Sequence, residues 1–188
     1  MNYFADRGKF LLRFFRSPLR IGSVTPSSRQ LVQAMLEPIP WNEVRIAVEL
    51  GAGTGVVTRE LKRWLPSDAM AFIFEKDPVL QIALRQDYPE FHHVAEAEIL
   101  RGAMKNRGVA GADVIFSSLP FANFSEDARV SILDQVRDGL TQNGVFTAYQ
   151  YTPQMKKLLG ERFRDVRVCF VPWNLPPAFI YICREPIR

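Results

Sequence analysis

The sequence predicts an α/β fold in which a mostly parallel sheet carries helices on both faces. Three observations support this prediction. Apolar runs alternate with segments of helical periodicity after residue 40, a glycine-rich turn follows the first apolar run, and the chain ends in two strand-like segments. A strand–helix–strand succession makes consecutive strands parallel and covers both faces of their sheet with helices. The two terminal segments predict an antiparallel pair at one sheet edge.

The predicted elements follow one another from residue 44 to residue 184. Five apolar runs have the length and composition of buried strands, at residues 44–50, 70–75, 91–95, 112–118 and 143–151. Three segments have helical periodicity, at residues 55–64, 78–87 and 126–140. The terminal strands, Phe163 to Val171 and Phe179 to Arg184, are joined by a proline-rich connection at residues 172–177. In such sheets a ligand binds at the carboxyl ends of the strands.

Composition limits the classes of protein to which the chain can belong. Its 188 residues are 47% apolar, which is enough for one domain with a core. No apolar run is as long as a membrane span, and we find no signal-peptide pattern, so we expect a cytoplasmic protein. A net charge of +4 and a pI of about 9.3 predict an anionic partner, either nucleic acid or anionic lipid. The two cysteines and two histidines lack metal-ligand spacing, so we expect no metal site.

Residues 1–40 are predicted to form an amphipathic helical extension of a domain that spans residues 41–188. Aromatic and basic residues interleave there at helical spacing, which is typical of a helix that lies on an anionic bilayer. A second helix is expected to start between Thr25 and Gln30, where Ser27 and Gln30 form a capping box. Two alternatives to membrane binding remain: the first helix packs on the sheet, or its charges bind RNA phosphates. The residues predicted to contact the membrane are Arg7, Lys9, Phe10, Arg13, Phe14 and Arg16.

The most informative stretch is the turn after the first predicted strand. Glu49 ends an apolar run, and glycines follow at alternate positions, Gly51, Gly53 and Gly55, before a helical segment. Glycine allows the backbone to turn tightly and to approach a ligand closely, and a helix start adds unpaired N–H groups. A dinucleotide fold would require a third glycine where Val56 stands. The E-x-G-x-G-x-G spacing instead resembles the first motif of class I S-adenosylmethionine-dependent methyltransferases.

This resemblance implies a Rossmann-like, seven-stranded sheet and S-adenosylmethionine as the cofactor. Glu75 ends the second predicted strand, 20 residues beyond Gly55, where a carboxylate can bind both ribose hydroxyls. Glu96 ends the third predicted strand and could accept a hydrogen bond from the adenine amino group. Glu49 would meet the amino group of the methionine moiety. The cofactor-binding residues are therefore predicted to be Glu49, Gly51, Gly53, Gly55, Glu75 and Glu96.

The exit of the fourth predicted strand, Ser118-Leu119-Pro120-Phe121, resembles the N-x-P-F/Y motif of amino-methyltransferases, with Ser118 in the place of the asparagine. In that motif the polar side chain and a neighbouring backbone carbonyl hold the target amine, and the aromatic ring stacks on it. Serine is shorter than asparagine, which argues against a flat adenine amine as the target. A proline-containing strand exit without a catalytic role is the alternative.

Longer stretches resemble the soluble bacterial phospholipid N-methyltransferases that methylate phosphatidylethanolamine. They comprise residues 18–27, 49–55, 117–121, 149–151 and 173–178, and so run through almost the whole chain. The resemblance implies that Tyr151 and Ser118 are catalytic and that Phe121, Tyr149 and Trp173 bind the substrate. Because a phenol ionises only near pH 10, it is a poor base, and we expect Tyr151 to position the amine more than to receive its proton. Aromatic faces there would attract a methylated ammonium.

The sequence thus predicts an enzyme that transfers methyl groups from S-adenosylmethionine to the amine of a phospholipid at the inner membrane face. Phosphatidylethanolamine is the expected acceptor. The enzyme's partners are expected to be an anionic membrane surface and the aminolipid, with nucleic acid as the weaker candidate. Another aminolipid, such as an ornithine lipid, remains open as the acceptor. The alternative function is that of an RNA adenine N6-methyltransferase, because this family also resembles rRNA adenine dimethylases.

Overall fold

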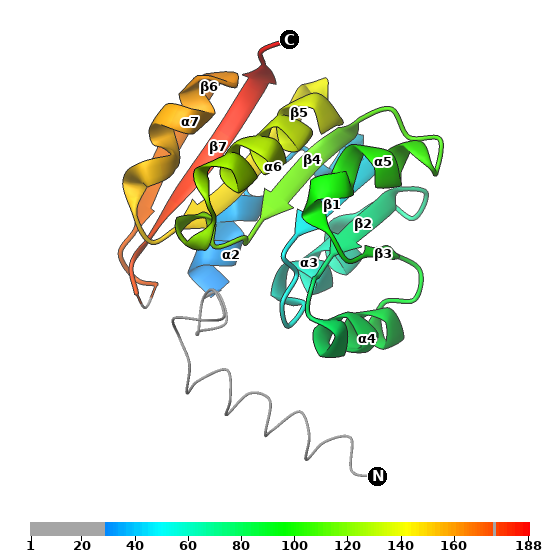
Figure 1. Cartoon of the computed structure of the whole chain (residues 1–188). Coiled ribbons are helices and arrows are strands. Elements are labelled where there is room, and N and C mark those ends of the chain that lie inside the picture. Colours follow the sequence, from blue (N-terminus) through cyan, green and yellow to red (C-terminus); the bar gives the residue numbers. More distant parts are fainter. Residues whose placement is uncertain (1–28, 175) are drawn as a thin grey trace.

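A computed structural model describes residues 29–174 and 176–188 of the chain. Seven strands form one sheet in the order β3-β2-β1-β4-β5-β7-β6 (Figure 1). This arrangement confirms the predicted fold class, a Rossmann-like and mostly parallel sheet with a terminal antiparallel pair. The strands are β1 (Ile46–Leu50), β2 (Met70–Phe74), β3 (His92–Val94), β4 (Ala112–Ser117), β5 (Leu140–Gln150), β6 (Phe163–Val171) and β7 (Ala178–Pro186).

The central strand is β1, which pairs in parallel with β2 on one side and with β4 on the other. β3 and β5 extend these pairs in parallel, whereas β7 is antiparallel to both β5 and β6. The chain therefore builds outward from β1 first toward β3 and then toward β6. The strand order reverses at β1, and such a switch point leaves a crevice at the carboxyl ends of the strands.

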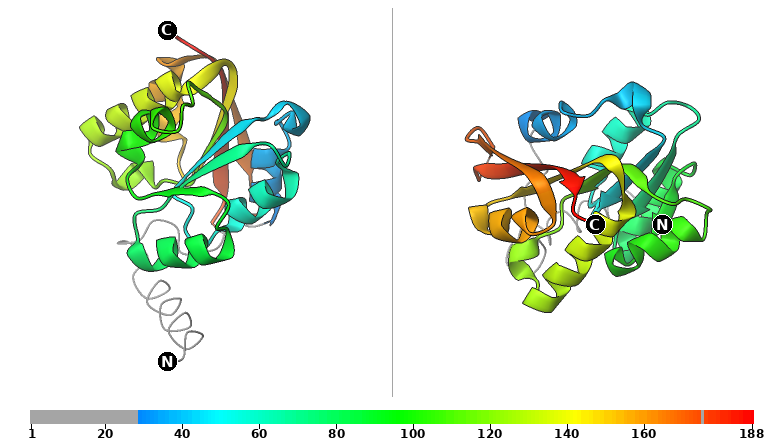
Figure 2. Two further views of the ribbon diagram at one scale, coloured as in Figure 1. Left: turned by 90° about the vertical axis from the view of Figure 1, so that its right-hand side faces the viewer. Right: turned by 90° about the horizontal axis from the view of Figure 1, so that it is seen from above.

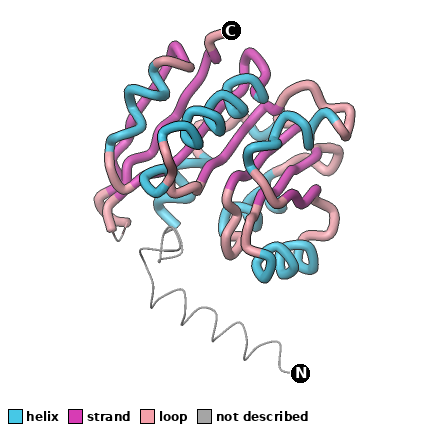
Figure 3. Tube along the Cα trace, in the orientation of Figure 1, coloured by secondary structure: helices cyan, strands magenta, loops and turns pink. Residues whose placement is uncertain are grey.

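Helices cover both faces of the sheet (Figures 2 and 3). One apolar cluster joins α2, α3 and α4 to one face, and a second joins α5, α6 and α7 to the other. The helices are α2 (Arg29–Leu36), α3 (Val56–Trp64), α4 (Pro78–Asp87), α5 (Leu100–Lys105), α6 (Glu126–Gly139) and α7 (Lys156–Gly160). Short 3-10 turns are η1 (Trp41–Glu43), η2 (Ala97–Ile99), η3 (Phe121–Asn123) and η4 (Pro153–Met155).

The three predicted helices agree with α3, α4 and α6 to within one residue at each end. Caps explain these clear boundaries: Asp77 accepts hydrogen bonds from the first N–H groups of α4, and Ser125 accepts one from the N–H of Ala128 in α6. The sequence did not predict α5 and α7, which have only six and five residues. Less than two turns of helix shows no apolar periodicity. β5 begins at Leu140, three residues before the predicted start.

Helix α2 packs on the sheet although it lies inside the predicted extension. Leu31 and Met35 are fully buried in the same cluster as residues of β5 and β7. The packed unit therefore includes residues that a division at residue 40 would leave outside. Ser27, the predicted helix cap, lies outside the described residues, as do the predicted membrane-contacting residues Arg7, Lys9, Phe10, Arg13, Phe14 and Arg16.

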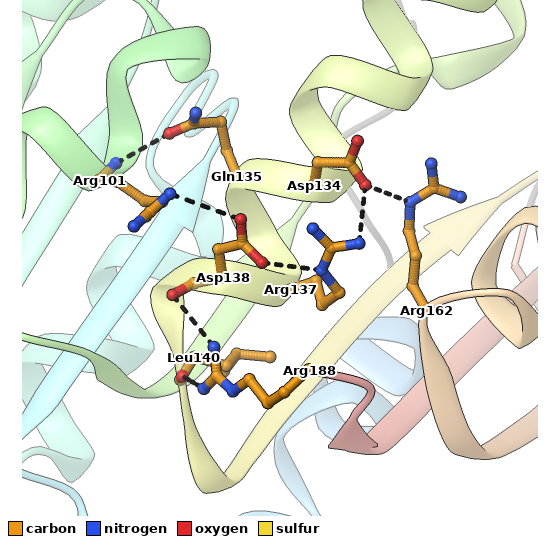
Figure 4. Close-up of polar contacts among 8 residues, drawn as sticks. All are labelled: Arg101, Asp134, Gln135, Arg137, Asp138, Leu140, Arg162 and Arg188. Carbon is orange, nitrogen blue, oxygen red and sulfur yellow. Dashed lines mark hydrogen bonds and ion pairs between the residues drawn. The ribbon is translucent and has the colours of Figure 1, made fainter.

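A group of charged residues fixes α6 to its neighbours (Figure 4). The buried side chain of Arg162 donates through Nε to Asp134 at 2.9 Å and through Nη1 to the carbonyl of Leu158 at 2.9 Å. Arg101 of α5 lies 3.4 Å from Asp138 of α6, and Arg188 donates to the carbonyls of Asp138 and Leu140. These bonds join α5, α6, the α7–β6 turn and the C-terminus, so they stabilise the domain away from the glycine turn.

Candidate functional site: the carboxyl edge of the sheet

The glycine turn joins β1 to α3 at the carboxyl edge of the sheet. Gly51, Gly53 and Gly55 all have positive φ, at 76°, 57° and 79°, a region that costs other residues about 1–2 kcal/mol. The N–H groups of Gly51 and Ala52 both donate to the carbonyl of Phe74 at the end of β2, at 2.9 and 3.0 Å. The turn is therefore fixed against the neighbouring strand before α3 begins.

The three glycines differ in what surrounds them. A Cβ on Gly51 would lie 2.9 Å from Cδ2 of Leu119, and one on Gly55 would lie 2.9 Å from Cδ2 of Leu84. Those atoms are the ends of flexible leucine side chains, so the positive φ, more than packing, requires glycine at both positions. A Cβ on Gly53 would meet no atom within 4 Å. Gly53 alone presents bare backbone to open space, as a turn that cradles a ligand must.

Glu75, at the end of β2, is held against this turn. Its Oε2 accepts a hydrogen bond from the N–H of Gly53 at 2.6 Å, and its Oε1 accepts one from the N–H of Asp77 at 2.8 Å. Burial raises the pKa of the Glu75 carboxyl, and the two backbone N–H groups oppose that rise. The structure thus brings together two predicted cofactor-binding residues that lie 22 positions apart in the sequence.

Glu49 is buried beneath the turn and is only half satisfied. Its Oε2 accepts from the Thr58 hydroxyl at 2.6 Å, whereas its buried Oε1 has no hydrogen-bond partner. Burial raises the pKa of Glu49 to about 7, the Thr58 hydrogen bond opposes this rise, and the charge of Glu75 adds to it. A buried carboxyl oxygen without a donor is costly. It would be satisfied by an ammonium group, so the site fits a ligand that carries a cationic amine.

Glu96 follows β3 at the same edge of the sheet. The register that pairs Phe74 with Val94 places it beside the end of β2, as predicted for a residue near the adenine. Its side chain is exposed and lies 3.6 Å from Nζ of Lys76. The predicted contact with adenine stays a prediction.

The exit of β4 lies next to β1. Ser118 donates its N–H to the carbonyl of Leu50 at 2.9 Å, and the side chain of Ser118 is half-buried. Phe121 is fully buried, and its ring packs edge-on against Phe124 with centroids 5.8 Å apart. The serine is therefore accessible from the carboxyl edge, whereas the ring predicted to stack on the target amine belongs to the core.

A residue that the sequence did not single out joins this exit to β5. The buried side chain of Gln150 donates through Nε2 to the carbonyl of Leu119 at 2.9 Å and to that of Tyr149 at 2.6 Å. The Leu119 carbonyl also accepts a hydrogen bond from the N–H of Phe121 at 2.9 Å, so Gln150 completes its hydrogen bonding and fixes the strand exit. Gln150 stands between two tyrosines, and nothing in that pattern indicates a cross-strand hydrogen bond.

The predicted substrate residues of β5 and the β6–β7 hairpin lie in different environments. Tyr149 is buried and Tyr151 is half-buried; their rings meet edge-on with centroids 5.8 Å apart. Trp173 lies at the tip of the hairpin and is 81% exposed. Tyr149 belongs to the cluster on the α2–α4 face and Phe121 to the cluster on the opposite face. The structure therefore brings together Tyr149 and Tyr151 but does not gather all four aromatic residues around one point.

Two other kinds of site are absent from the described residues. Within residues 29–174 and 176–188, no group of three or more His, Cys, Asp or Glu side chains is placed to hold a metal ion. In the same part of the chain no helix is long and apolar enough to cross a bilayer.

Comparison with known proteins gives one close relative and many structures of similar fold. No protein-family model matches the chain. The ornithine lipid N-methyltransferase of Singulisphaera acidiphila is 33% identical over 180 residues, which cover 93% of this chain and 94% of that protein.

The fold is similar to that of the N-methyltransferase NodS of Bradyrhizobium japonicum, solved with S-adenosyl-L-homocysteine. The TM-score is 0.71 at 14% identity, with 95% of this chain and 98% of that one covered. It is also similar to the 16S rRNA N2 G1207 methyltransferase of T. thermophilus, with a TM-score of 0.66 at 21% identity, covering 89% and 45%. Such likenesses show the fold, which serves very different methyl acceptors.

The raised pKa of Glu49 predicts how stability changes with pH. Since the pKa of Glu49 is about 7 in the folded protein and its ordinary value is 4.5, the folded state keeps a proton that the unfolded state loses between these values. Glu49 therefore destabilises the ligand-free protein progressively as the pH rises from 4.5 to 7, by on the order of 3 kcal/mol. Glu49→Gln should gain that much stability relative to wild type between pH 4.5 and 7.5. Urea unfolding across this range measures the difference, and two parallel stability curves would contradict it.

Proposed function

Because the chain belongs to the same family as the ornithine lipid N-methyltransferase of Singulisphaera acidiphila, we propose that it methylates the amine of a membrane aminolipid. The observation that carries this proposal is the 33% identity along nearly the full length of both chains. The methyl donor is S-adenosylmethionine, whose sulfonium supplies an electrophilic methyl group. The remaining chemistry consists of binding and orientation by the protein, which is how an in-line transfer is accelerated.

Three groups on the carboxyl edge fit this donor. Glu75 would accept hydrogen bonds from the ribose hydroxyls. Gly53 leaves the space that the nucleoside or its amino-acid chain requires beside the turn. The unpartnered Oε1 of Glu49 would receive the ammonium group, and that charge would favour the ionised carboxylate.

The acceptor must present a neutral amine with its lone pair directed at the methyl group. Ser118 offers a hydroxyl and Tyr151 offers a phenol just after β5. These groups can accept the amine hydrogens and leave the lone pair pointing toward the donor. Tyr151 is therefore proposed as a positioning group for the amine.

We take an ornithine lipid as the first candidate acceptor and phosphatidylethanolamine as the second. The relative's name supports the former, and the sequence stretches described above support the latter. Both headgroups carry a primary amine, so the same groups could hold either. The reaction would take place at the cytoplasmic face of the membrane, and the basic and aromatic residues of the N-terminal segment are candidates for docking there.

Methylation of an RNA adenine is the second candidate function, because the resembled family is also similar to rRNA adenine dimethylases, although Ser118 replaces the asparagine of their strand exit. A flat base, however, needs an accessible aromatic face on which to stack. The ring of Phe121 is fully buried against the core. This burial supports a lipid amine over a base as the acceptor.

Gly53→Ala is expected to weaken the binding of S-adenosylhomocysteine at least tenfold. Its new methyl group would occupy the open space beside the turn. The matched control is Gly108→Ala: Gly108 also has positive φ (73°) and open space around it, but it lies between α5 and β4. Both variants should lose similar stability, and only the first should lose affinity in calorimetry. Equal affinity in the two variants would remove the glycine turn from the cofactor site.

The acceptor is tested with radiolabelled S-adenosylmethionine and three substrates offered separately. These are vesicles that contain ornithine lipid, vesicles that contain phosphatidylethanolamine, and structured RNA. Label is expected in the organic extract of one or both vesicle reactions and not in RNA. Label found in RNA alone would replace the proposed function by the second candidate.

Tyr151→Phe is expected to lower kcat more than tenfold on the accepted lipid, with cofactor affinity changed less than twofold. That pattern would mean that the phenol hydroxyl acts on the amine in the transition state and not on cofactor binding. Full activity of Tyr151→Phe on every lipid acceptor would make Tyr151 a structural residue.

A further inference from the structure

The tip of the β6–β7 hairpin projects at the same edge of the sheet as the candidate site. β6 and β7 pair from Phe163–Pro186 to Val171–Ala178, so residues 172–177 form the connection at the end of β6. β7 also pairs with β5, with Phe179 opposite Gln150 at the carboxyl end of that strand. The hairpin tip therefore lies beside the residues that follow β5, including Tyr151.

This tip exposes large aromatic side chains in a stretch without charge. Trp173 is 81% exposed and Phe170 is 56% exposed, and the Phe170 ring lies 5.1 Å from that of Phe179. The 16 residues from Val168 to Cys183 contain no Asp, Glu, Lys or Arg. Exposed apolar area of this kind marks an interaction surface. Tryptophan in particular favours the boundary between lipid and water, where its ring has an apolar body and a polar edge.

Basic residues flank the tip. Lys156 and Lys157 are exposed at the start of α7, six and seven residues after the end of β5. Within the described ranges neither lysine forms an ion pair. An uncharged aromatic tip beside unpaired lysines matches a bilayer whose headgroups include anionic lipids.

A second exposed apolar pair lies on the same edge, beyond the glycine turn. Val79 and Ile82, three residues apart on α4, are 56% and 54% exposed. Figure 1 shows α4 and the hairpin connection below opposite ends of the sheet, and the side view in Figure 2 also places both at that end of the molecule. The glycine turn and the ends of β1, β4 and β5 lie between them. If both the hairpin tip and the α4 pair contact the bilayer, the site between them would face the bilayer as well.

We propose that the β6–β7 tip, with Phe170 and Trp173, and the α4 pair, with Val79 and Ile82, form a docking surface for the lipid bilayer. This inference rests on the proposed lipid acceptor. The carboxyl edge of the sheet faces the membrane, and the headgroup amine reaches Tyr151 and Ser118 while the acyl chains stay in the bilayer. The surface belongs to the packed domain and includes none of residues 1–28.

Binding is tested with full-length protein and vesicles of phosphatidylethanolamine and phosphatidylglycerol. Tryptophan fluorescence should shift to shorter wavelength on mixing, and Trp173→Phe should abolish the shift. Trp64→Phe is the control, because Trp64 is also exposed, at 48%, but lies at the opposite end of α3 from the glycine turn. Phe170→Ala/Trp173→Ala should reduce co-sedimentation at least fivefold. An unchanged shift in Trp173→Phe, or unchanged co-sedimentation, would overturn the proposal.

Activity separates this inference from the proposed function. Phe170→Ala/Ile82→Ser, which leaves Trp173 in place, should methylate a short-chain monomeric lipid acceptor at the wild-type rate and a long-chain acceptor in vesicles at least fivefold more slowly. Equal rates on vesicles would overturn the docking surface and leave the proposed function intact. Wild-type protein that binds vesicles through the tip but methylates no lipid would overturn only the function. Ultracentrifugation that shows a wild-type dimer dissociated by the double substitution would assign the surface to a second copy of the chain instead.

Discussion

The pairing of β1 with two parallel neighbours is the constraint on which the site depends. β1 lies between β2 and β4, and both its faces are covered, so its residues from Ala47 to Leu50 are buried. A strand in this position ends at the switch point of the sheet, where the connections after β1 and β4 turn in opposite directions and leave room for a ligand. The glycine turn, Glu75 and Ser118 follow the ends of β1, β2 and β4, and the carbonyls of Phe74 and Leu50 anchor the segments that leave their neighbours. The distances within the site are thus set by backbone hydrogen bonds of the sheet, and residues far apart in sequence meet there.

Local signals in the sequence predicted the parts of the fold that have strong local causes. Continuous apolar runs marked β1, β2 and β4, and the Asp77 and Ser125 caps explain why α4 and α6 matched their predicted ranges. The hydrogen bond between Gly53 and Glu75 is a structural finding that the glycine spacing alone does not predict. The exposure of Trp173, the burial of Phe121 and the hydrogen bond from Gln150 to Leu119 depend on contacts between distant elements, which periodicity does not contain. An aromatic residue in a loop has the same one-letter pattern whether it packs inward or faces solvent. The roles predicted for the N-terminal residues remain predictions, because those residues lie outside the described ranges.

Two carboxyl groups with raised pKa converge on the glycine turn, and in the proposed cofactor site their ionised forms would favour the donor over its product. Burial raises the pKa of both Glu49 and Glu75, and the charge of Glu75 adds to the rise at Glu49. S-adenosylmethionine carries a sulfonium charge that is lost when its methyl group leaves. Ionised carboxylates in a partly buried site attract the charged form more strongly, since the effective dielectric constant is lower there than in water. In the proposed site, Glu49 and Glu75 would therefore also favour release of the product after transfer.

The sheet has two open edges, and the chain protects them differently against pairing with other molecules. β3 has only three residues, so it offers little backbone to an incoming strand. β6 has nine and would be a much better template, but Arg164 and Arg167 are exposed along it. Charged side chains on an edge strand oppose the addition of another strand because they would be desolvated or brought close to like charges. Both arginines lie before Val168, where the uncharged stretch begins. β6 therefore opposes aggregation along most of its length but keeps an apolar end.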